Sequence, residues 1–281
     1  MERKKITPQD ILAKKQQGKK IVRIVCYDYP MALLADQAEV DSILVGDSVG
    51  MVMMGMTNTL PVTMEEMIYH CRAVMRAVKY ALVIGDLPFL SYQTSIRDAI
   101  YNAGLLMKEG GVDAIKLEGG KEFAPMVKAI VDAGIPVVGH IGLTPQTISK
   151  LGGYKVQGTD VAAARKLIED ALALESAGIF MLTMECVPDR LAEFICKKLA
   201  IPATGIGSGL FTDGQTLNLY DLLGLFERFT PKFVKKYANL SGDILEALKK
   251  YKEDVEQGIF PGAEHSFHIK DDVLESVLSA Y

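Results

Sequence analysis

The sequence predicts an α/β fold in which eight parallel strands close into a (β/α)8 barrel. Short apolar runs rich in β-branched residues alternate with amphipathic helices along the chain. Within these runs polar and apolar residues do not alternate, which is typical of strands buried on both faces. The length of 281 residues is also close to the roughly 250 that one barrel takes. An open, doubly wound parallel sheet remains the structural alternative.

The helices are predicted from their caps as well as from their periodicity. A threonine–proline pair at Thr7 and a glycine at Gly18 bracket a helix over about residues 8–17. Thr63 and Glu66 form a capping box ahead of apolar residues at helical spacing. Ser95 with Asp98 repeats this device, and further helices are expected over Phe123–Ala133, Val161–Ala177 and Asp189–Leu199.

The expected strands occupy the apolar runs between these helices. They are Ile21–Cys26, Ser42–Val45, Ala81–Ile84, Ala114–Leu117, Pro136–Val138, Ile179–Met184, Ile201–Ile206 and, as the weakest, Thr216–Leu223. An apolar stripe that includes Ile244, Leu248 and Val255 then predicts a helical C-terminal extension over about residues 243–281. We expect one barrel domain over residues 1–281, with the extension covering the barrel or contacting another subunit.

Composition excludes several function classes. The net charge is −4, and no run of basic residues is long enough to follow a phosphate backbone, so nucleic acid is not an expected partner. No apolar stretch approaches the roughly 20 residues of a membrane helix, and MERKKITPQD does not resemble a signal peptide. The four cysteines lack CxxC spacing and are interpreted as reduced thiols. A cytoplasmic enzyme is expected.

Ionisable residues follow several of the expected strands. In parallel architectures the carboxyl ends of the strands build the ligand site. The residues concerned are Asp28, Asp47, Asp86, Lys116, Glu118, His140 and Glu185. Carboxylates gathered at one rim repel one another, so a cation is expected among them, and oxygen ligands favour Mg²⁺, with other divalent ions as alternatives. For His140, a polar site role and a structural hydrogen bond are equally good interpretations.

Several motifs carry a resemblance to a known family. They are Leu44–Gly50 (LVGDSVG), Thr59–Thr63 (TLPVT), Gly85–Phe89 (GDLPF), Lys116–Gly120 (KLEGG), Gly139–Gln146 (GHIGLTPQ), Gly153–Gly158 (GYKVQG), Glu185–Pro188 (ECVP) and Gly205–Gly209 (GIGSG). In this order, over about residues 5–268, the chain resembles the ketopantoate hydroxymethyltransferase family. The methionine-rich segment 51–56 and the tail after His268 depart from the family pattern.

The resemblance implies a barrel of the phosphoenolpyruvate/pyruvate type and a reaction. The family transfers a hydroxymethyl group from 5,10-methylenetetrahydrofolate to 3-methyl-2-oxobutanoate in the presence of Mg²⁺. The product is 2-dehydropantoate (ketopantoate), in the biosynthesis of pantothenate and coenzyme A. The resemblance also implies a homo-oligomer, expected to be a decamer built as a pentamer of dimers.

Site residues are implied position by position. Asp47 and Asp86 match metal-binding aspartates that also meet the substrate, and Glu118 matches a further metal-associated carboxylate. Ser48 and Lys116 match substrate-contacting positions. Glu185 matches a general base that removes the C3 proton of the oxo acid and leaves an enolate stabilised by the metal.

Two other functions are weighed against this one. A metal-dependent lyase of the same barrel type would form or cleave a carbon–carbon bond in an oxo acid without folate. Isocitrate-lyase-like enzymes place a cysteine motif after the fourth strand, where this chain has Glu118-Gly119-Gly120-Lys121. A barrel retained as a non-catalytic protein would have lost Asp47, Asp86 or Glu185, and all three are present.

Overall fold

A computed structural model describes residues 3–281 and shows a closed barrel of eight parallel strands. The strands are β1 (Ile21–Val25), β2 (Ser42–Val45), β3 (Leu82–Asp86), β4 (Ala114–Glu118), β5 (Val137–Gly142), β6 (Met181–Glu185), β7 (Ala203–Ile206) and β8 (Gly214–Asn218). Each strand pairs with its neighbour in sequence, and β1 pairs with β8 to close the ring. This closure confirms the barrel and excludes the open doubly wound sheet.

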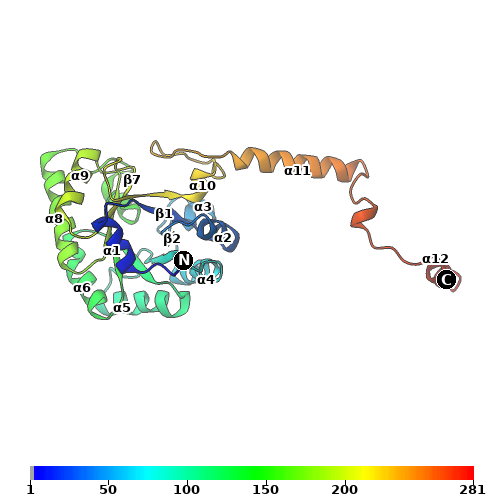
Figure 1. The fold of residues 1–281 in the computed structure, drawn as a ribbon, viewed down its shortest axis with the longest axis horizontal. Helices are drawn as coiled ribbons and strands as arrows, with labels where there is room; N and C mark the ends of the chain where they lie inside the picture. Colours follow the sequence, from blue (N-terminus) through cyan, green and yellow to red (C-terminus); the bar gives the residue numbers. More distant parts are fainter. Residues whose placement is uncertain (1–2) are drawn as a thin grey trace.

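Helices connect the strands and form an outer layer around the barrel (Figure 1). The α-helices are α1 (Pro8–Gln16), α2 (Tyr29–Gln37), α3 (Val49–Val52), α4 (Met64–Ala77), α5 (Ile96–Leu105), α6 (Ala124–Asp132), α7 (Ile148–Leu151), α8 (Val161–Ser176), α9 (Asp189–Lys198), α10 (Leu219–Leu222), α11 (Leu240–Glu256) and α12 (Asp271–Leu278). Single turns of π- and 3-10 helix occupy Leu106–Gly110, Lys121–Phe123, Pro145–Thr147 and Ala263–His265.

Local cap signals predicted the starts of α1, α4 and α5. Thr7 and Thr63 each accept a hydrogen bond from the backbone three residues later and complete a capping box, with Asp10 and Glu66 respectively. At α5 the predicted box is only half formed. Ser95 accepts from the Asp98 amide, but the Asp98 carboxylate accepts from the Thr94 hydroxyl at 2.8 Å instead.

The prediction for the eighth strand was wrong in its bounds. The strand is Gly214–Asn218, and the residues after it turn into the short helix α10 because the Asn218 side chain caps the amide of Tyr220. Gly214 permits the earlier start, since a Cβ there would lie 2.2 Å from the carbonyl oxygen of Ile21 on β1. Barrel closure therefore sets this boundary.

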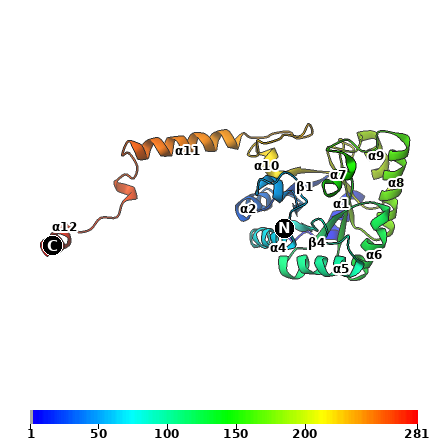
Figure 2. The same cartoon turned by 180° about the vertical axis from the view of Figure 1, so that it is seen from behind.

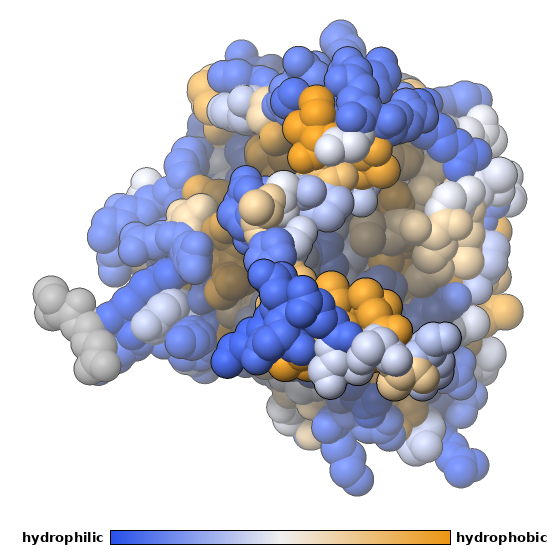
Figure 3. Space-filling model, turned by 90° about the vertical axis from the view of Figure 1, so that its right-hand side faces the viewer, coloured by the Kyte–Doolittle hydropathy of each residue, from blue (hydrophilic) through white to orange (hydrophobic). Residues whose placement is uncertain are grey.

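Beyond β8 the chain leaves the barrel as an extended arm, defined here as residues 239–281, which carries α11 and α12 (Figures 1 and 2). The predicted apolar stripe lies on α11, but Leu248 is 59% exposed and Tyr251 56% exposed. The side of the molecule from which the arm extends shows hydrophobic patches among hydrophilic residues (Figure 3). Within this single chain the arm does not cover the barrel.

Two further predictions concern membrane spans and the state of the cysteines. Within residues 3–281, no helix combines the length and the apolar character that a membrane span requires. All four cysteines are free thiols, and Cys71 is fully buried on α4, as expected for a small core residue.

Candidate active site

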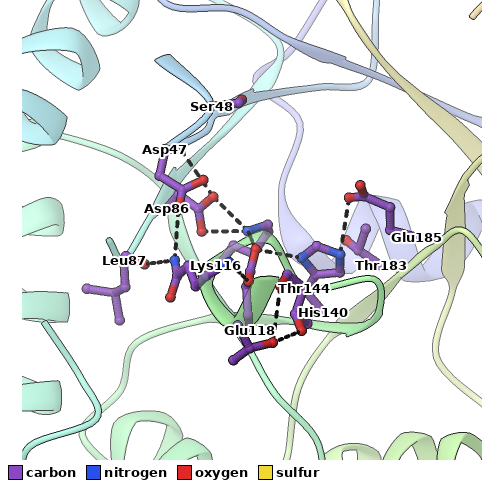
Figure 4. Close-up of polar contacts among 12 residues, drawn as sticks. Asp47, Ser48, Asp86, Leu87, Lys116, Glu118, His140, Thr144, Thr183 and Glu185 are labelled. Atoms are coloured by element: carbon purple, nitrogen blue, oxygen red, sulfur yellow. Dashed lines mark hydrogen bonds and ion pairs between the residues drawn. The ribbon is translucent and has the colours of Figure 1, made fainter. Parts of the chain in front are cut away.

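The predicted site residues converge on one cavity of about 870 Å³ at the carboxyl ends of the strands. Asp47 and Ser48 follow β2 after Gly46, Asp86 ends β3, Lys116 and Glu118 belong to β4, and Glu185 ends β6; all line the cavity. Three of them, Asp86, Glu118 and Glu185, are the last residues of strands, so the barrel itself fixes their positions. Figure 4 shows Asp47, Asp86, Lys116 and Glu118 grouped together, with Glu185 joined to them through His140 and Ser48 set apart.

Lys116 and Asp86 form a buried ion pair. The Lys116 ammonium donates to both carboxylate oxygens of Asp86 at 2.6 Å, and lies 3.8 Å from Glu118. Burial disfavours the charged lysine, but the charges of Asp86 and Glu118 outweigh it and raise the pKa of Lys116. The site therefore holds a fixed positive charge.

Asp47 is held beside this pair. Its backbone N–H donates to Asp86 at 3.3 Å, and its carboxylate accepts from the Gln146 amide at 2.9 Å. Burial, followed by repulsion from Asp86 and Glu118, raises the pKa of Asp47 well above its usual range. A cation bound at this carboxylate would relieve that repulsion.

His140 links two glutamates. Its Nδ1 lies 3.2 Å from Glu118 and its Nε2 lies 3.4 Å from Glu185, as Figure 4 shows. These are ion-pair distances without the alignment of a good hydrogen bond. Burial lowers the pKa of the imidazole, but Glu118 and Glu185 outweigh it and raise that pKa to about 9. Burial raises the pKa of Glu118, but His140 and Lys116 outweigh it, so this pKa is lowered.

The backbone around Glu185 is tightly constrained. Its carbonyl accepts from the Leu143 amide at 2.8 Å, and a Cβ on Gly142 would lie 2.2 Å from that oxygen. Cys186 adopts a left-handed φ of 50°, which is uncommon for a residue other than glycine. The end of β6 is thereby turned so that Glu185 lines the cavity.

Ser48 is oriented by an aromatic neighbour. Its hydroxyl lies 2.7 Å from the hydroxyl of Tyr27, which in turn accepts from the Asn218 amide at 2.6 Å. Tyr27 stacks on Tyr220 with ring centroids 5.5 Å apart. Ser48 thus presents its hydroxyl from a fixed position at the cavity wall.

Sequence reasoning missed three contributors. Gln146 donates to Asp47 and also to the Leu87 carbonyl, while Tyr27 and Asn218 support Ser48. Gln146 closes the GHIGLTPQ motif, so that motif was the available signal. Tyr27 lies just after β1 and Asn218 ends β8. Neither is charged, so the search for ionisable residues at strand ends did not select them.

The methionine-rich segment lies at the cavity mouth. Met51 and Val52 line the cavity, and the Tyr154 hydroxyl donates to the Met51 sulfur at 3.6 Å. Arg228 donates to the carbonyls of Gly55 and Met56 at 3.1 and 2.9 Å, which ties this segment to the chain after β8.

The carboxylates fit a hard divalent metal in part. Among residues 3–281, no three His, Cys, Asp or Glu side chains are arranged to hold an ion by themselves. Asp47 and Asp86 face the same cavity, and Asp86 also accepts from Lys116. Glu118 is engaged by His140 and by the backbone N–H of Gln146 at 3.0 Å. Mg²⁺ commonly takes one or two carboxylates and completes its shell with water and substrate, so the aspartate pair suits it.

Fold and site together define a barrel enzyme whose buried acids and bases act at the carboxyl ends of the strands. Residues 5–263 match the ketopantoate hydroxymethyltransferase family model. The chain belongs to the ketopantoate hydroxymethyltransferase family and is a transferase of that kind. This membership decides against both the lyase and the non-catalytic barrel.

Curated relatives agree with this assignment, and solved structures agree with the fold. The chain is 56% identical to the 3-methyl-2-oxobutanoate hydroxymethyltransferase of Moorella thermoacetica, covering 95% of this chain and 99% of that protein. It is 53% identical to the enzyme of the same name from Heliobacterium modesticaldum, covering 96% and 98%. Similar folds include phosphonopyruvate hydrolase in complex with oxalate and Mg²⁺ (TM-score 0.60, 13% identity, 98% and 99% coverage). Another is 2,3-dimethylmalate lyase of the PEP mutase/isocitrate lyase superfamily (TM-score 0.59, 14% identity, 97% and 94% coverage).

Proposed function

We propose that this enzyme transfers a hydroxymethyl group from 5,10-methylenetetrahydrofolate to 3-methyl-2-oxobutanoate, giving 2-dehydropantoate for pantothenate and coenzyme A synthesis. The relatives bear the name of this oxo acid. The observation that carries the proposal is one cavity lined by a carboxylate at Glu185, a buried ammonium at Lys116 and two buried aspartates. These groups suit proton removal next to a carbonyl.

Asp47 and Asp86 would hold Mg²⁺, and Glu118 would complete the acidic environment of the same metal site. The repulsion that raises the pKa of Asp47 supports a bound cation there. Bound Mg²⁺ would supply Lewis-acid chemistry, by polarising the ketone oxygen of the substrate. Other divalent ions with oxygen preference are alternatives.

Three residues of the chain would bind the oxo acid and remove its proton. Glu185 would accept the proton from C3 of the oxo acid, because its carboxylate lines the cavity and is only 15% exposed. Lys116 would favour the negative charge that develops on the substrate oxygens. Ser48, oriented by Tyr27, would donate a hydrogen bond to the substrate carboxylate.

The outer part of the cavity would hold the folate. About 870 Å³ exceeds what a five-carbon oxo acid needs and leaves room for a second substrate. Aromatic side chains at the mouth could stack on a flat pterin ring; they are Tyr154, Phe226, Phe229 and Phe233. The carbon nucleophile would then meet the methylene group at the boundary between the two subsites.

We further propose that the chain forms a homo-oligomer, expected to be a decamer built as a pentamer of dimers. The arm leaves apolar residues of α11 and α12 exposed in the single chain. The barrel surface over β1 and β8 is also less covered than elsewhere, since Val22 is 49% exposed and Gln215 is exposed. A second copy could cover both. The four free cysteines suit the proposed cytoplasmic location.

Deuterium exchange at C3 of 3-methyl-2-oxobutanoate tests the proposed chemistry. The purified enzyme should exchange this position in the presence of Mg²⁺ without folate, and chelation should abolish the exchange. Adding 5,10-methylenetetrahydrofolate should convert the oxo acid to 2-dehydropantoate. An enzyme that makes the product but never exchanges C3 without folate would contradict the order of steps proposed here.

A further inference from the structure

A charged side chain lies inside the barrel beneath the active site. Arg23, in the middle of β1, is fully buried. Its guanidinium donates to three threonine hydroxyls, those of Thr183 (2.6 Å), Thr204 (2.7 Å) and Thr216 (2.9 Å). Its Nη1 has no hydrogen-bond partner, and within residues 3–281 no carboxylate lies at ion-pair distance from it.

Such an arrangement is costly in a barrel interior. A buried cation is normally neutralised by a carboxylate, whereas hydroxyl groups solvate the charge without cancelling it. Burial lowers the pKa of Arg23 to about 10, while the negative charge of Asp86 acts in the opposite direction. The guanidinium therefore stays protonated at neutral pH, and its field extends to the neighbouring layer.

That neighbouring layer is the floor of the active site. Thr216 itself lines the cavity. Arg23 precedes the cavity-lining Val25 by two residues, and Thr183 precedes Glu185 by the same interval. Residues two apart on a strand share a face and are roughly 7 Å apart, so Arg23 lies one layer below the reacting groups.

We propose that Arg23 is a specificity-determining charge, which strengthens binding of the anionic oxo acid and weakens binding of the divalent metal. This inference rests on the proposed function, since it takes Mg²⁺ and a 2-oxo acid as the ligands. A positive charge attracts the substrate carboxylate and opposes the entry of a cation. A purely structural arginine would affect both ligands in the same direction.

The expected size follows from Coulomb's law. A unit charge acting over roughly 10 Å at an effective dielectric near 20 changes a binding constant by about tenfold. Neutralising Arg23 should therefore weaken oxo-acid binding by about tenfold. It should tighten Mg²⁺ binding by about a hundredfold, because the cation carries two charges and the interaction energy doubles. Opposite changes in the two binding constants distinguish an electrostatic effect of Arg23 from a structural one.

The experiment compares Arg23→Gln, which is neutral, with Arg23→Lys, which keeps the charge. Titration calorimetry measures Mg²⁺ binding to the full-length enzyme alone, and then 3-methyl-2-oxobutanoate binding at saturating Mg²⁺. Mildly alkaline buffer limits proton displacement from the carboxylates. R23Q should show the two opposite shifts, and R23K should stay close to the wild type.

Other outcomes overturn the inference. If R23Q weakens both ligands together, or changes neither, Arg23 acts only as a structural residue. If R23Q does not fold, the apolar variant R23M/T183V/T204V supplies the neutral centre, because it leaves no unpaired hydroxyl at positions 183 and 204. It should give the same opposite shifts. A wild-type enzyme that binds neither Mg²⁺ nor the oxo acid would contradict the proposed function instead.

Discussion

The ammonium group of Lys116 lies 2.6 Å from both carboxylate oxygens of Asp86, and both side chains are almost completely buried. Neighbouring strands β3 and β4 place the two residues in register, opposite each other. The pair therefore belongs to the barrel framework as well as to the site. Variants of either residue should affect stability and binding together.

Lys116→Met should destabilise the protein and raise the KM for the oxo acid. Removing one partner of a buried ion pair leaves an uncompensated charge on Asp86 and costs about 3–5 kcal/mol. Chemical unfolding and steady-state kinetics check the two effects. Lys121→Met is the matched control, since its ion pair with Glu169 is exposed and its loss should leave both quantities unchanged. A K116M enzyme with wild-type KM and kcat would remove Lys116 from substrate binding.

Glu185→Gln should slow C3 deuterium exchange by about 10²-fold or more, which is the usual scale for loss of a general base. Oxo-acid affinity should change little, because glutamine keeps the size of the side chain. Proton NMR of the substrate follows the exchange. Glu193→Gln on α9 serves as the control, since this residue pairs with Lys197 outside the cavity. Exchange at the native rate in E185Q would assign the base elsewhere.

Asp47→Ala should weaken Mg²⁺ binding by at least tenfold and reduce oxo-acid binding with it. The substitution removes one of the two carboxylates that face the cavity and are free of the histidine. Calorimetric titration of Mg²⁺ measures the first effect directly. Asp160→Ala, at the N-cap of α8, is a useful control because it perturbs a helix start without touching the site. Unchanged metal affinity in D47A would contradict the metal assignment.

His140 should make stability depend on pH on the alkaline side. Its pKa is raised from 6.5 to about 9 in the folded state, so the protonated form favours folding. This contribution is fully present below pH 6.5 and is lost as pH rises through about 9. It amounts to about 3 kcal/mol at most, from 1.36 kcal/mol per pKa unit. Urea unfolding of metal-free enzyme across this range measures it, and His140→Gln should flatten the slope. Equal slopes in both proteins would show that His140 does not carry this effect.

The double variant Leu248→Asp/Tyr251→Asp should reduce the size of the assembly. Both residues are exposed on the apolar side of α11 in the single chain, and a charge there opposes burial in an interface. Light scattering coupled to size exclusion gives the mass. Lys249→Asp, on the same helix, should leave the mass unchanged. An unaltered mass in the double variant would separate the arm from self-association.

The sequence alone predicted the closed barrel, several helix starts and a set of polar residues at strand ends, most of which line one cavity. Caps such as Thr63 with Glu66 act over three residues, so a local pattern is enough to predict them. The ends of six strands were readable to within two residues, because parallel strands buried on both faces form continuous apolar runs that stop near polar residues such as Asp47. The ends of β5 and β8 were not.

Tertiary structure decided the contacts that give those residues their chemistry. The bond from Gln146 to Asp47 spans 99 residues, and the bonds from Arg23 to its three threonines span 160 to 193. His140 meets Glu118 and Glu185 only because β4, β5 and β6 are adjacent in the closed ring. Sequence patterns record local geometry, whereas a pKa or an ion pair depends on which distant strands the barrel brings together.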